Sequence, residues 1–230
     1  MFKTETHLHV SEVSPCAKLS AAEMVRRYTE AGYHTVFVAD HLYQGYFDIL
    51  GERSWEEKVD CFLSGYRAAK EASEGLPVRV LLSAELMFEN SCNHYLLYGI
   101  DEAFLKARDD LFSMTIESFY PYAKEKGVTV VQAHPFRNHR CYPTFDFVDG
   151  VEVENANPRS ENHNDEALAL AEEYGLPMTG GSDAHRMEDV ANSGVCSQEE
   201  ICSAADYVRL LLANELRVIR KAEEDDLSDC

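Results

Sequence analysis

Histidine and acidic residues close five separate apolar runs of the sequence. In the first run, Thr4-Glu5-Thr6-His7-Leu8-His9, two imidazoles stand two residues apart. On a β-strand this spacing puts both side chains on one face, about 6–7 Å apart along the chain, which is close enough to hold one metal ion. The residues that close the other four runs are Asp40-His41, Glu85, His134 and Asp183-Ala184-His185.

Converging imidazole nitrogens and carboxylate oxygens are typical ligands of catalytic metal ions, and a bridging carboxylate can hold two cations about 3.5–4 Å apart. A single histidine at a strand end is more often a hydrogen-bonded structural residue. Five of the nine histidines at comparable positions, however, favour a shared site. We therefore expect a multinuclear metal centre built from His7, His9, Asp40, His41, Glu85, His134, Asp183 and His185.

The elements that must position these residues alternate between strand and helix patterns. Ser20 followed by Glu23, and Ser54 followed by Glu57, are capping boxes that start helices. Short continuous apolar runs, which suit strands covered on both faces, predict strands over 3–10, 34–39, 78–84, 94–100, 128–133, 150–154 and 177–181. Helices are expected over 20–32, 54–73, 101–126, 165–174 and, capped by Ser197 and Glu200, 197–214.

Strands separated by helices indicate βα units and a parallel sheet. With 230 residues and about seven strands, the chain fits one α/β domain, a distorted (β/α)7 barrel similar to a TIM barrel. Active sites of such barrels lie at the C-terminal ends of the strands, where the candidate ligands and Glu154 all stand. His94 is the exception, because it precedes its strand. We expect a barrel domain over 1–222 and a solvated acidic tail over 223–230.

The composition excludes several classes of protein. A formal charge of −20 disfavours binding to duplex nucleic acid. No apolar run reaches the roughly 20 residues of a membrane span, and no signal peptide is evident. Seven cysteines without a C-x-x-C pair suit free thiols in the cytoplasm, and Cys16 is interpreted as a buried, inert thiol rather than a soft ligand. The motifs of serine hydrolases, P-loop enzymes and dinucleotide-binding proteins are absent from the sequence.

The ordered motifs resemble those of the polymerase and histidinol phosphatase (PHP) family. The residues that carry the resemblance, between 3 and about 186, are His7-Leu8-His9, Ala39-Asp40-His41, Ala84-Glu85-Leu86, Ala133-His134-Pro135 and Gly181-Ser182-Asp183-Ala184-His185. The resemblance implies a distorted seven-stranded βα barrel with two or three zinc, manganese or iron ions. It also implies a stand-alone phosphoesterase, similar to histidinol phosphatases.

The resemblance also implies a role for each ligand. His7, His9 and Asp183 would hold a first metal ion, and Glu85 would bridge it to a second. The remaining ligands are His94 and His134 for the second ion, and His41 and His185 for a third. The chain departs from the family pattern after His9, where it continues as Ser11-Glu12-Val13-Ser14-Pro15, so Glu12 is a candidate substitute ligand at the third ion.

The expected reaction is metal-assisted hydrolysis of a small phosphate monoester, possible substrates being histidinol phosphate and nucleotides. Metal ions can lower the pKa of a bound water from 15.7 towards about 7, as zinc does. Glu85 and Asp183 would serve catalysis as metal ligands, and Asp40 either protonates the leaving oxygen or orients His41. Arginine is the natural clamp for phosphate, and the candidates are Arg137, Arg140 and Arg159.

Three alternatives remain open on the sequence alone. The first is a phosphodiesterase or exonuclease acting on short oligonucleotides. The second is an amidohydrolase-type metal hydrolase, whose barrel also opens with His-x-His and closes with Asp. The third is a metal-binding module without catalysis, which the nearly complete ligand set disfavours.

Overall fold

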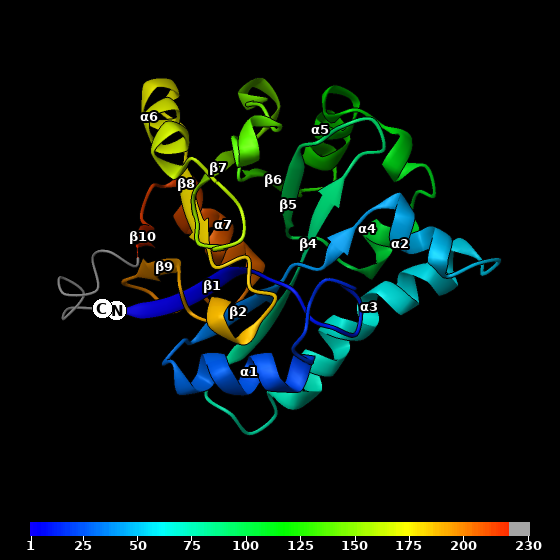
Figure 1. Ribbon diagram of the computed structural model, residues 1–230, viewed down its shortest axis with the longest axis horizontal. Coiled ribbons are helices and arrows are strands. Elements are labelled where there is room, and N and C mark those ends of the chain that lie inside the picture. The colour runs from blue at the N-terminus through cyan, green and yellow to red at the C-terminus, as the bar shows by residue number, and fades with distance from the viewer. Residues whose placement is uncertain (221–230) are drawn as a thin grey trace.

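One sheet runs through the chain, and its strand order is β10-β9-β1-β2-β4-β5-β6-β7-β8, with β3 paired to β4 beside this path. The structure, a computed structural model, describes residues 1–220 (Figure 1). Within this range the strands are β1 (Phe2–Leu8), β2 (Thr35–Val38), β3 (His41–Leu42), β4 (Arg79–Met87), β5 (His94–Tyr98), β6 (Thr129–Ala133), β7 (Gly150–Asn155), β8 (Met178–Gly181), β9 (Gly194–Ser197) and β10 (Arg217–Ile219).

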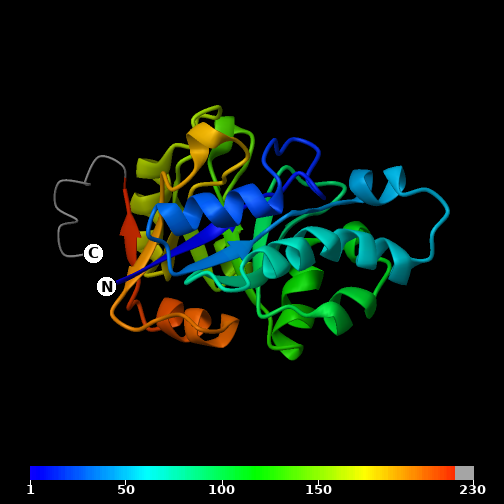
Figure 2. The ribbon, with the colours of Figure 1, turned by 90° about the horizontal axis from the view of Figure 1, so that it is seen from below.

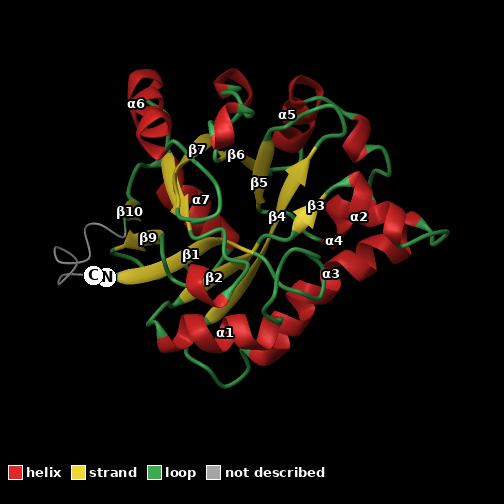
Figure 3. Cartoon of the chain, in the orientation of Figure 1, coloured by secondary structure: helices red, strands yellow, loops and turns green. Residues whose placement is uncertain are grey.

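Helices surround the sheet (Figure 3). The expected capping boxes are present at Ser20 and Ser54, where each serine and the glutamate three residues later bond each other's backbone. The helices of residues 1–220 are α1 (Ala21–Glu30), α2 (Gln44–Ile49), α3 (Trp55–Ala72), α4 (Glu102–Lys106), α5 (Ile116–Glu125), α6 (Asn164–Tyr174) and α7 (Ala204–Leu212). None of these helices combines the length and the apolar character that crossing a membrane requires.

The sheet curves so that β1 comes into contact with the segment that follows β8. Leu8 forms a parallel bridge with Ala184, and the backbone N–H of His9 donates to the carbonyl of Ala184 at 3.0 Å. The threonine hydroxyl of Thr6 reaches the Gly180 carbonyl at 2.8 Å. These contacts nearly close the barrel, and they confirm the fold class expected from the sequence.

The two ends of the barrel are covered differently. α7 packs its buried residues Tyr207, Leu210 and Leu211 in one cluster with Phe37 and Tyr98. Tyr98 is the last residue of β5, at the opposite end of that strand from His94. α7 therefore covers the end of the barrel away from His94, and the ligand-bearing rim lies at the other end. Outside the sheet, α1 and α3 lie side by side along β1, β2 and β4 (Figures 1 and 2).

All seven expected strands are present. The prediction of a parallel sheet is wrong for two of the strands in the observed sheet, β5 and β9. β5 runs antiparallel to both β4 and β6, and β9 runs antiparallel to β1 and β10. Because β5 is reversed, its first residue, His94, pairs with Met87 at the end of β4 and with Ala133 at the end of β6. His94 therefore belongs to the same rim as the other ligands, although it precedes its strand.

Two helix predictions need correction. The stretch 101–126 is not one helix: α4, capped by Asp101, and α5 are separated by a short 3-10 turn at Leu111–Ser113. The helix expected from Ser197 begins later, because Ser197 ends β9 and the cap is Ser203, whose hydroxyl accepts from Asp206 N–H. The short strands β3, β9 and β10 and the helix α2 were not expected. The predicted tail over 223–230 lies outside the described residues, and the domain boundary at 222 stays a prediction.

Candidate metal centre

Histidine and carboxylate side chains from six segments of the chain meet at this rim. Most of them are buried, with 1% or less of their surface exposed, whereas His41 and His94 lie at the opening with 21% and 23% of their side chains exposed. The buried members are His7, His9, Glu85, His134 and Asp183.

Glu85 is the residue on which the histidines converge. Nitrogen atoms of five imidazoles lie 2.5–3.6 Å from its two carboxylate oxygens. Burial by itself would raise the pKa of Glu85, but the charges of His94, His41 and His7 hold it well below its usual value. The carboxylate is therefore ionised at neutral pH. The five histidines are His7, His9, His41, His94 and His134.

Asp183 faces the first histidine pair from the other side. Its Oδ1 lies 3.2 Å from His9 Nε2 and 3.7 Å from His7 Nε2. Its backbone has φ 48°, and that of His134 has φ 29°, both in the left-handed region that non-glycine residues rarely adopt. Such conformations cost on the order of 1–3 kcal/mol and concentrate at functional sites. His134 follows β6 directly and Asp183 stands two residues after the end of β8, so each left-handed residue lies where its strand reaches the rim.

Several atoms of this cluster are buried without a hydrogen-bond partner. His7 Nε2, His9 Nε2 and Asp183 Oδ1 have none in the described part of the chain. An unpaired buried polar atom is costly, and native proteins rarely leave one. Asp183 Oδ1 lies 3.2–3.7 Å from the other two atoms. A metal ion placed among the three atoms would accept electron pairs from all of them. The residues therefore fit the metal ions that their types imply.

The electrostatic balance of the cluster supports the same conclusion. Burial would lower the pKa of His7, but the charges of Glu152, Asp183 and Glu85 raise it well above its usual value. Burial and the neighbouring imidazoles of His41 and His185 lower the pKa of His9. The carboxylates around His7 thus carry negative charge that attracts a cation. His9, whose pKa is lowered, offers a neutral imidazole beside them.

One supporting residue was missed by the sequence analysis. Glu152, fully buried on β7, accepts from His7 Nδ1–H at 2.8 Å and from the backbone N–H of His134 at 3.0 Å. A carboxylate inside the apolar strand predicted over 150–154 needs a buried partner, and this feature of the sequence could have identified Glu152. Glu154, which stands at the strand end instead, is paired with Arg220 at 3.6 Å and is not in the cluster.

Asp40 and Glu12 occupy places that the sequence did not define. Asp40 Oδ1 accepts from Val10 N–H at 2.9 Å and from the Ser14 hydroxyl at 2.7 Å, and this hydroxyl accepts from His41 N–H at 3.2 Å. Burial raises the pKa of Asp40 to about 7. Glu12 is exposed, and both of its oxygens lie 3.0 Å from the N–H of Ala21, at the start of α1. The structure thus does not bring Glu12 to the cluster.

The three candidate arginines have different surroundings. Arg137 Nη2 donates to Asp183 Oδ2 at 2.5 Å and to Asn155 at 2.9 Å, which places it against the cluster. Arg159 makes two hydrogen bonds, of 2.6 and 2.7 Å, to Asp189, whose carboxylate also accepts from His185 N–H. Arg140 is exposed. Only Arg137 therefore contacts a candidate ligand side chain.

The interpretation of Cys16 as a buried, inert thiol is wrong. The loop that carries it folds back over the rim, so the residue is exposed and its Sγ lies 3.2 Å from His41 Nε2. Burial would raise the pKa of this thiol, but hydrogen bonds with His185 and His41 lower it to about 6. The sequence spacing gave no indication of this fold-back.

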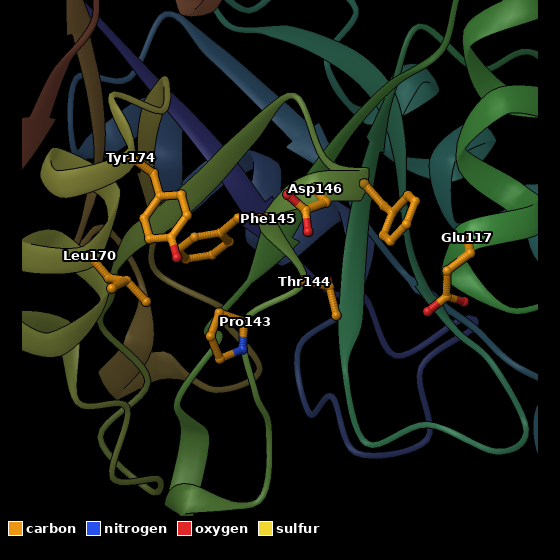
Figure 4. A pocket seen from close by; sticks show the side chains of 8 residues that line it. Glu117, Pro143, Thr144, Phe145, Asp146, Leu170 and Tyr174 are labelled. Atoms are coloured by element: carbon orange, nitrogen blue, oxygen red, sulfur yellow. The ribbon is translucent and has the colours of Figure 1, made fainter.

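Two hollows of similar size differ in their chemistry. One, of about 220 Å³, adjoins the cluster and is lined by Cys16, His41, Tyr43, Glu85, Met87 and His94. The other, of about 260 Å³, has Phe145 and Tyr174 on one side and Glu117 on the other (Figure 4). No histidine or cysteine lines the second hollow. The hollow beside Glu85 is therefore the candidate substrate pocket.

Comparison with known proteins relates the chain to a family and to a fold. A family model described as PHP-associated matches residues 161–215, which include α6, Asp183, His185 and α7. The curated proteins compared with the chain yielded no match.

Several solved structures share the fold at low sequence identity. PsfC from Pseudomonas syringae has a TM-score of 0.68 and 18% identity, with 98% of this chain and 94% of PsfC covered. A two-domain protein from Bacteroides vulgatus, described as containing a PHP-like metal-dependent phosphoesterase, has a TM-score of 0.68 and 16% identity over 95% of this chain and 64% of its own. An amidohydrolase from Chromobacterium violaceum has a TM-score of 0.59 and 16% identity, covering 97% and 99%. The family match over residues 161–215 and the shared fold agree with the resemblance that the motifs predict.

Proposed function

We propose that this chain is a metal-dependent phosphoesterase of the polymerase and histidinol phosphatase family and that it hydrolyses a small phosphate monoester. One observation carries the proposal: Glu85 lies within 2.5–3.6 Å of nitrogen atoms of five histidines, and the unpartnered Oδ1 of Asp183 lies opposite. Purely structural histidines would have their polar atoms paired.

The candidate ligands around Glu85 would form neighbouring metal-ion positions. His7, His9 and Asp183 would hold one ion, and Glu85 would be shared with the position that His94 and His134 flank. The remaining pair, His41 and His185, has Nε2 atoms 3.4 Å apart and would serve a further ion. Zinc, manganese and iron all accept such nitrogen and oxygen ligands.

Hydrolysis adds water across a P–O bond and releases inorganic phosphate and an alcohol. When bound, divalent ions would neutralise phosphoryl charge and lower the pKa of a water molecule. Arg137 would bind a phosphoryl oxygen, since its Nη2 and Nε are held by Asp183, Asn155 and Asn162 and its side chain is still 18% exposed. A guanidinium held in this way contributes charge without reorganising during the reaction.

Asp40 would act by positioning rather than as a proton donor. Its Oδ1 is used by Val10 and Ser14, and the hydroxyl of Ser14 in turn accepts from the backbone of His41. Asp40 would therefore fix the direction of His41, which is one of the two roles that the sequence left open.

The pocket and the charge favour small substrates. The hollow beside the cluster has a volume of about 220 Å³, below the roughly 300–1,000 Å³ of typical ligand pockets. Tyr43 and Met87 form its apolar part and would contact the alcohol portion of the ester. The formal charge of −20 repels long polyanions, so a duplex nuclease is disfavoured.

The test combines metal content with a substrate panel. The purified protein should contain at least two divalent ions per chain, and it should hydrolyse p-nitrophenyl phosphate or one of the natural monoesters in the panel. His9→Ala and Glu85→Gln should lose both metal and turnover, whereas Glu89→Gln, an exposed change near the end of the same strand, should keep both. Full metal loading without turnover of any monoester would overturn the proposal.

The same panel addresses the alternatives. It includes phosphodiesters such as dinucleotides, and N-acyl and cyclic amides, because an amidohydrolase shares the fold. Turnover of amides alone would favour the amidohydrolase function. Histidinol phosphate and nucleoside monophosphates would identify the substrate, and cell fractionation would test the predicted cytoplasmic location.

A further inference from the structure

Cys16, His41 and His185 come from three distant segments and meet at the outer side of the metal centre. Cys16 Sγ lies 3.2 Å from His41 Nε2, and His41 Nε2 lies 3.4 Å from His185 Nε2. Cys16 also contacts His185. The three side chains therefore surround one point at the mouth of the pocket that Cys16 and His41 line.

The contacts of the two imidazoles define which of their nitrogen atoms face each other. His185 Nδ1–H donates to the Asp183 carbonyl at 2.9 Å, and His41 Nδ1 lies 2.5 Å from Glu85 Oε2. Each Nδ1 atom thus faces an oxygen, and Nε2 is the ring nitrogen of each imidazole that is left to bind a metal ion. The two Nε2 atoms lie 3.4 Å apart, a separation at which both can be ligands of one metal ion.

His9, a candidate ligand of the first ion, lies beside this place. Its side chain is fully buried, and its Nε2 has no hydrogen-bond partner. Nitrogen atoms of His9, His41 and His185 all lie within 4.8 Å of one another. Imidazoles grouped at this spacing could hold a metal ion, and the sulfur of Cys16 lies next to two of them.

The backbone holds Cys16 in place against this group. Lys18 N–H donates to the carbonyl of His185 at 2.7 Å, and Ala17 N–H donates to Ser14 at 3.0 Å. The loop is thus bonded to the very segment that carries His185. Main-chain hydrogen bonds on the residues that follow Cys16 therefore hold its thiol close to the two histidines.

We propose that Cys16 supplies a thiolate ligand to a metal ion that His41 and His185 also bind, and that this ligand set selects zinc, cobalt(II) or iron(II) over manganese and magnesium. Thiolate is a soft ligand, which manganese and magnesium bind poorly. On binding, the S–H bond is broken, its proton leaves to solvent and the sulfur electron pair is shared with the metal. This inference rests on the proposed metal centre and adds a sulfur ligand to it.

Cobalt(II) substitution tests the sulfur ligand directly. The metal-free full-length protein is titrated with cobalt(II), and thiolate-to-cobalt charge transfer is followed in the near ultraviolet. The wild type should bind three ions and show the band, whereas Cys16→Ser should bind two and lack it. His185→Ala should also lose the band, because the thiol alone does not hold the ion. X-ray absorption of the zinc form should show sulfur at about 2.3 Å from the metal.

Cys92→Ser is the matched control, since Cys92 lies near the same rim and its thiol donates to the Arg140 carbonyl. This variant should retain the band and all three ions. A band that persists in Cys16→Ser, or a wild type that binds cobalt without any thiolate band, would overturn the inference and leave the phosphoesterase proposal intact. A wild type that binds no cobalt, zinc or manganese would overturn both.

Discussion

Glu152 accepts a hydrogen bond from Nδ1 of His7 at 2.8 Å. It lies inside β7, between the apolar residues Val151 and Val153. The bond places the proton of His7 on Nδ1 and leaves Nε2 directed at Glu85 and Asp183. A carboxylate behind a metal-binding histidine fixes its orientation and raises its basicity. Glu152 therefore fixes the orientation of His7, the first candidate ligand of the centre.

We expect Glu152→Gln to lower metal affinity by about 10–100-fold, the usual effect of losing such a partner. The glutamine amide can accept at one atom only, and its NH2 would face two donors, His134 N–H and Asn155 Nδ2. Metal titration followed by calorimetry measures the change. Glu154→Gln, two residues along the same strand, should leave the affinity unaltered, and an equal loss in both variants would contradict the role given to Glu152.

Arg137→Ala should reduce kcat/KM by about 10²-fold or more, since it removes a positioned donor for a phosphoryl oxygen. Steady-state kinetics with the best monoester, together with inhibition by inorganic phosphate, measures this effect.

Arg140 is the control for that prediction. Its side chain is exposed, and Arg140→Ala should change kcat/KM by less than about twofold, as for an ordinary surface substitution. If Arg140→Ala were the more damaging variant, Arg140 and not Arg137 would be the phosphate ligand.

The stability of the metal-free protein should depend on the ionisation of Glu154. Burial raises the pKa of this carboxyl, although Arg220 opposes the shift. The folded state therefore holds the proton more tightly than the unfolded chain, and the free energy of unfolding falls as pH rises above the ordinary glutamate pKa. Urea unfolding between about pH 4 and about pH 8 should show that Glu154→Gln removes this part of the decline. A variant with the wild-type pH slope would refute the prediction.

Removal of the metal ions should lower the thermal midpoint. A ligand at 100 times its Kd stabilises the folded state by about 2.7 kcal/mol, which corresponds to roughly 5–10 °C for a chain of this size. Differential scanning calorimetry before and after chelation measures the shift. His9→Ala should show a much smaller shift than the wild type. No change on chelation of the wild type would argue against ions bound only to the folded state.

The sequence predicted which histidines and carboxylates come together because each of these candidate ligands follows an apolar run, and strand ends meet at one rim of a barrel. It did not predict the direction of β5, since hydrophobicity patterns are the same for a parallel and an antiparallel buried strand. His94 was therefore predicted as a ligand from the motif alone, although the predicted topology did not place it at the rim. The reversed strand resolves this.

Other features depended on contacts between distant residues. Ser197 and Glu200 have the spacing of a capping box, but the pairing of β9 with β1 outweighs that local signal. Arg159 has the charge of a phosphate ligand, yet Asp189, 30 residues away, engages it. The fold-back of Cys16 onto His41 likewise depends on main-chain bonds to His185.

The pairing of β1 with β9 has a consequence for synthesis on the ribosome. The first strand made, Phe2–Leu8, waits for Gly194–Ser197 before its second edge is covered. At about 5–20 residues per second, the interval is roughly 10–40 s. During that time the edge of β1 at Phe2, Lys3 and Thr4 is open to wrong partners, including another nascent chain. The chain therefore has a long period in which a chaperone would protect β1.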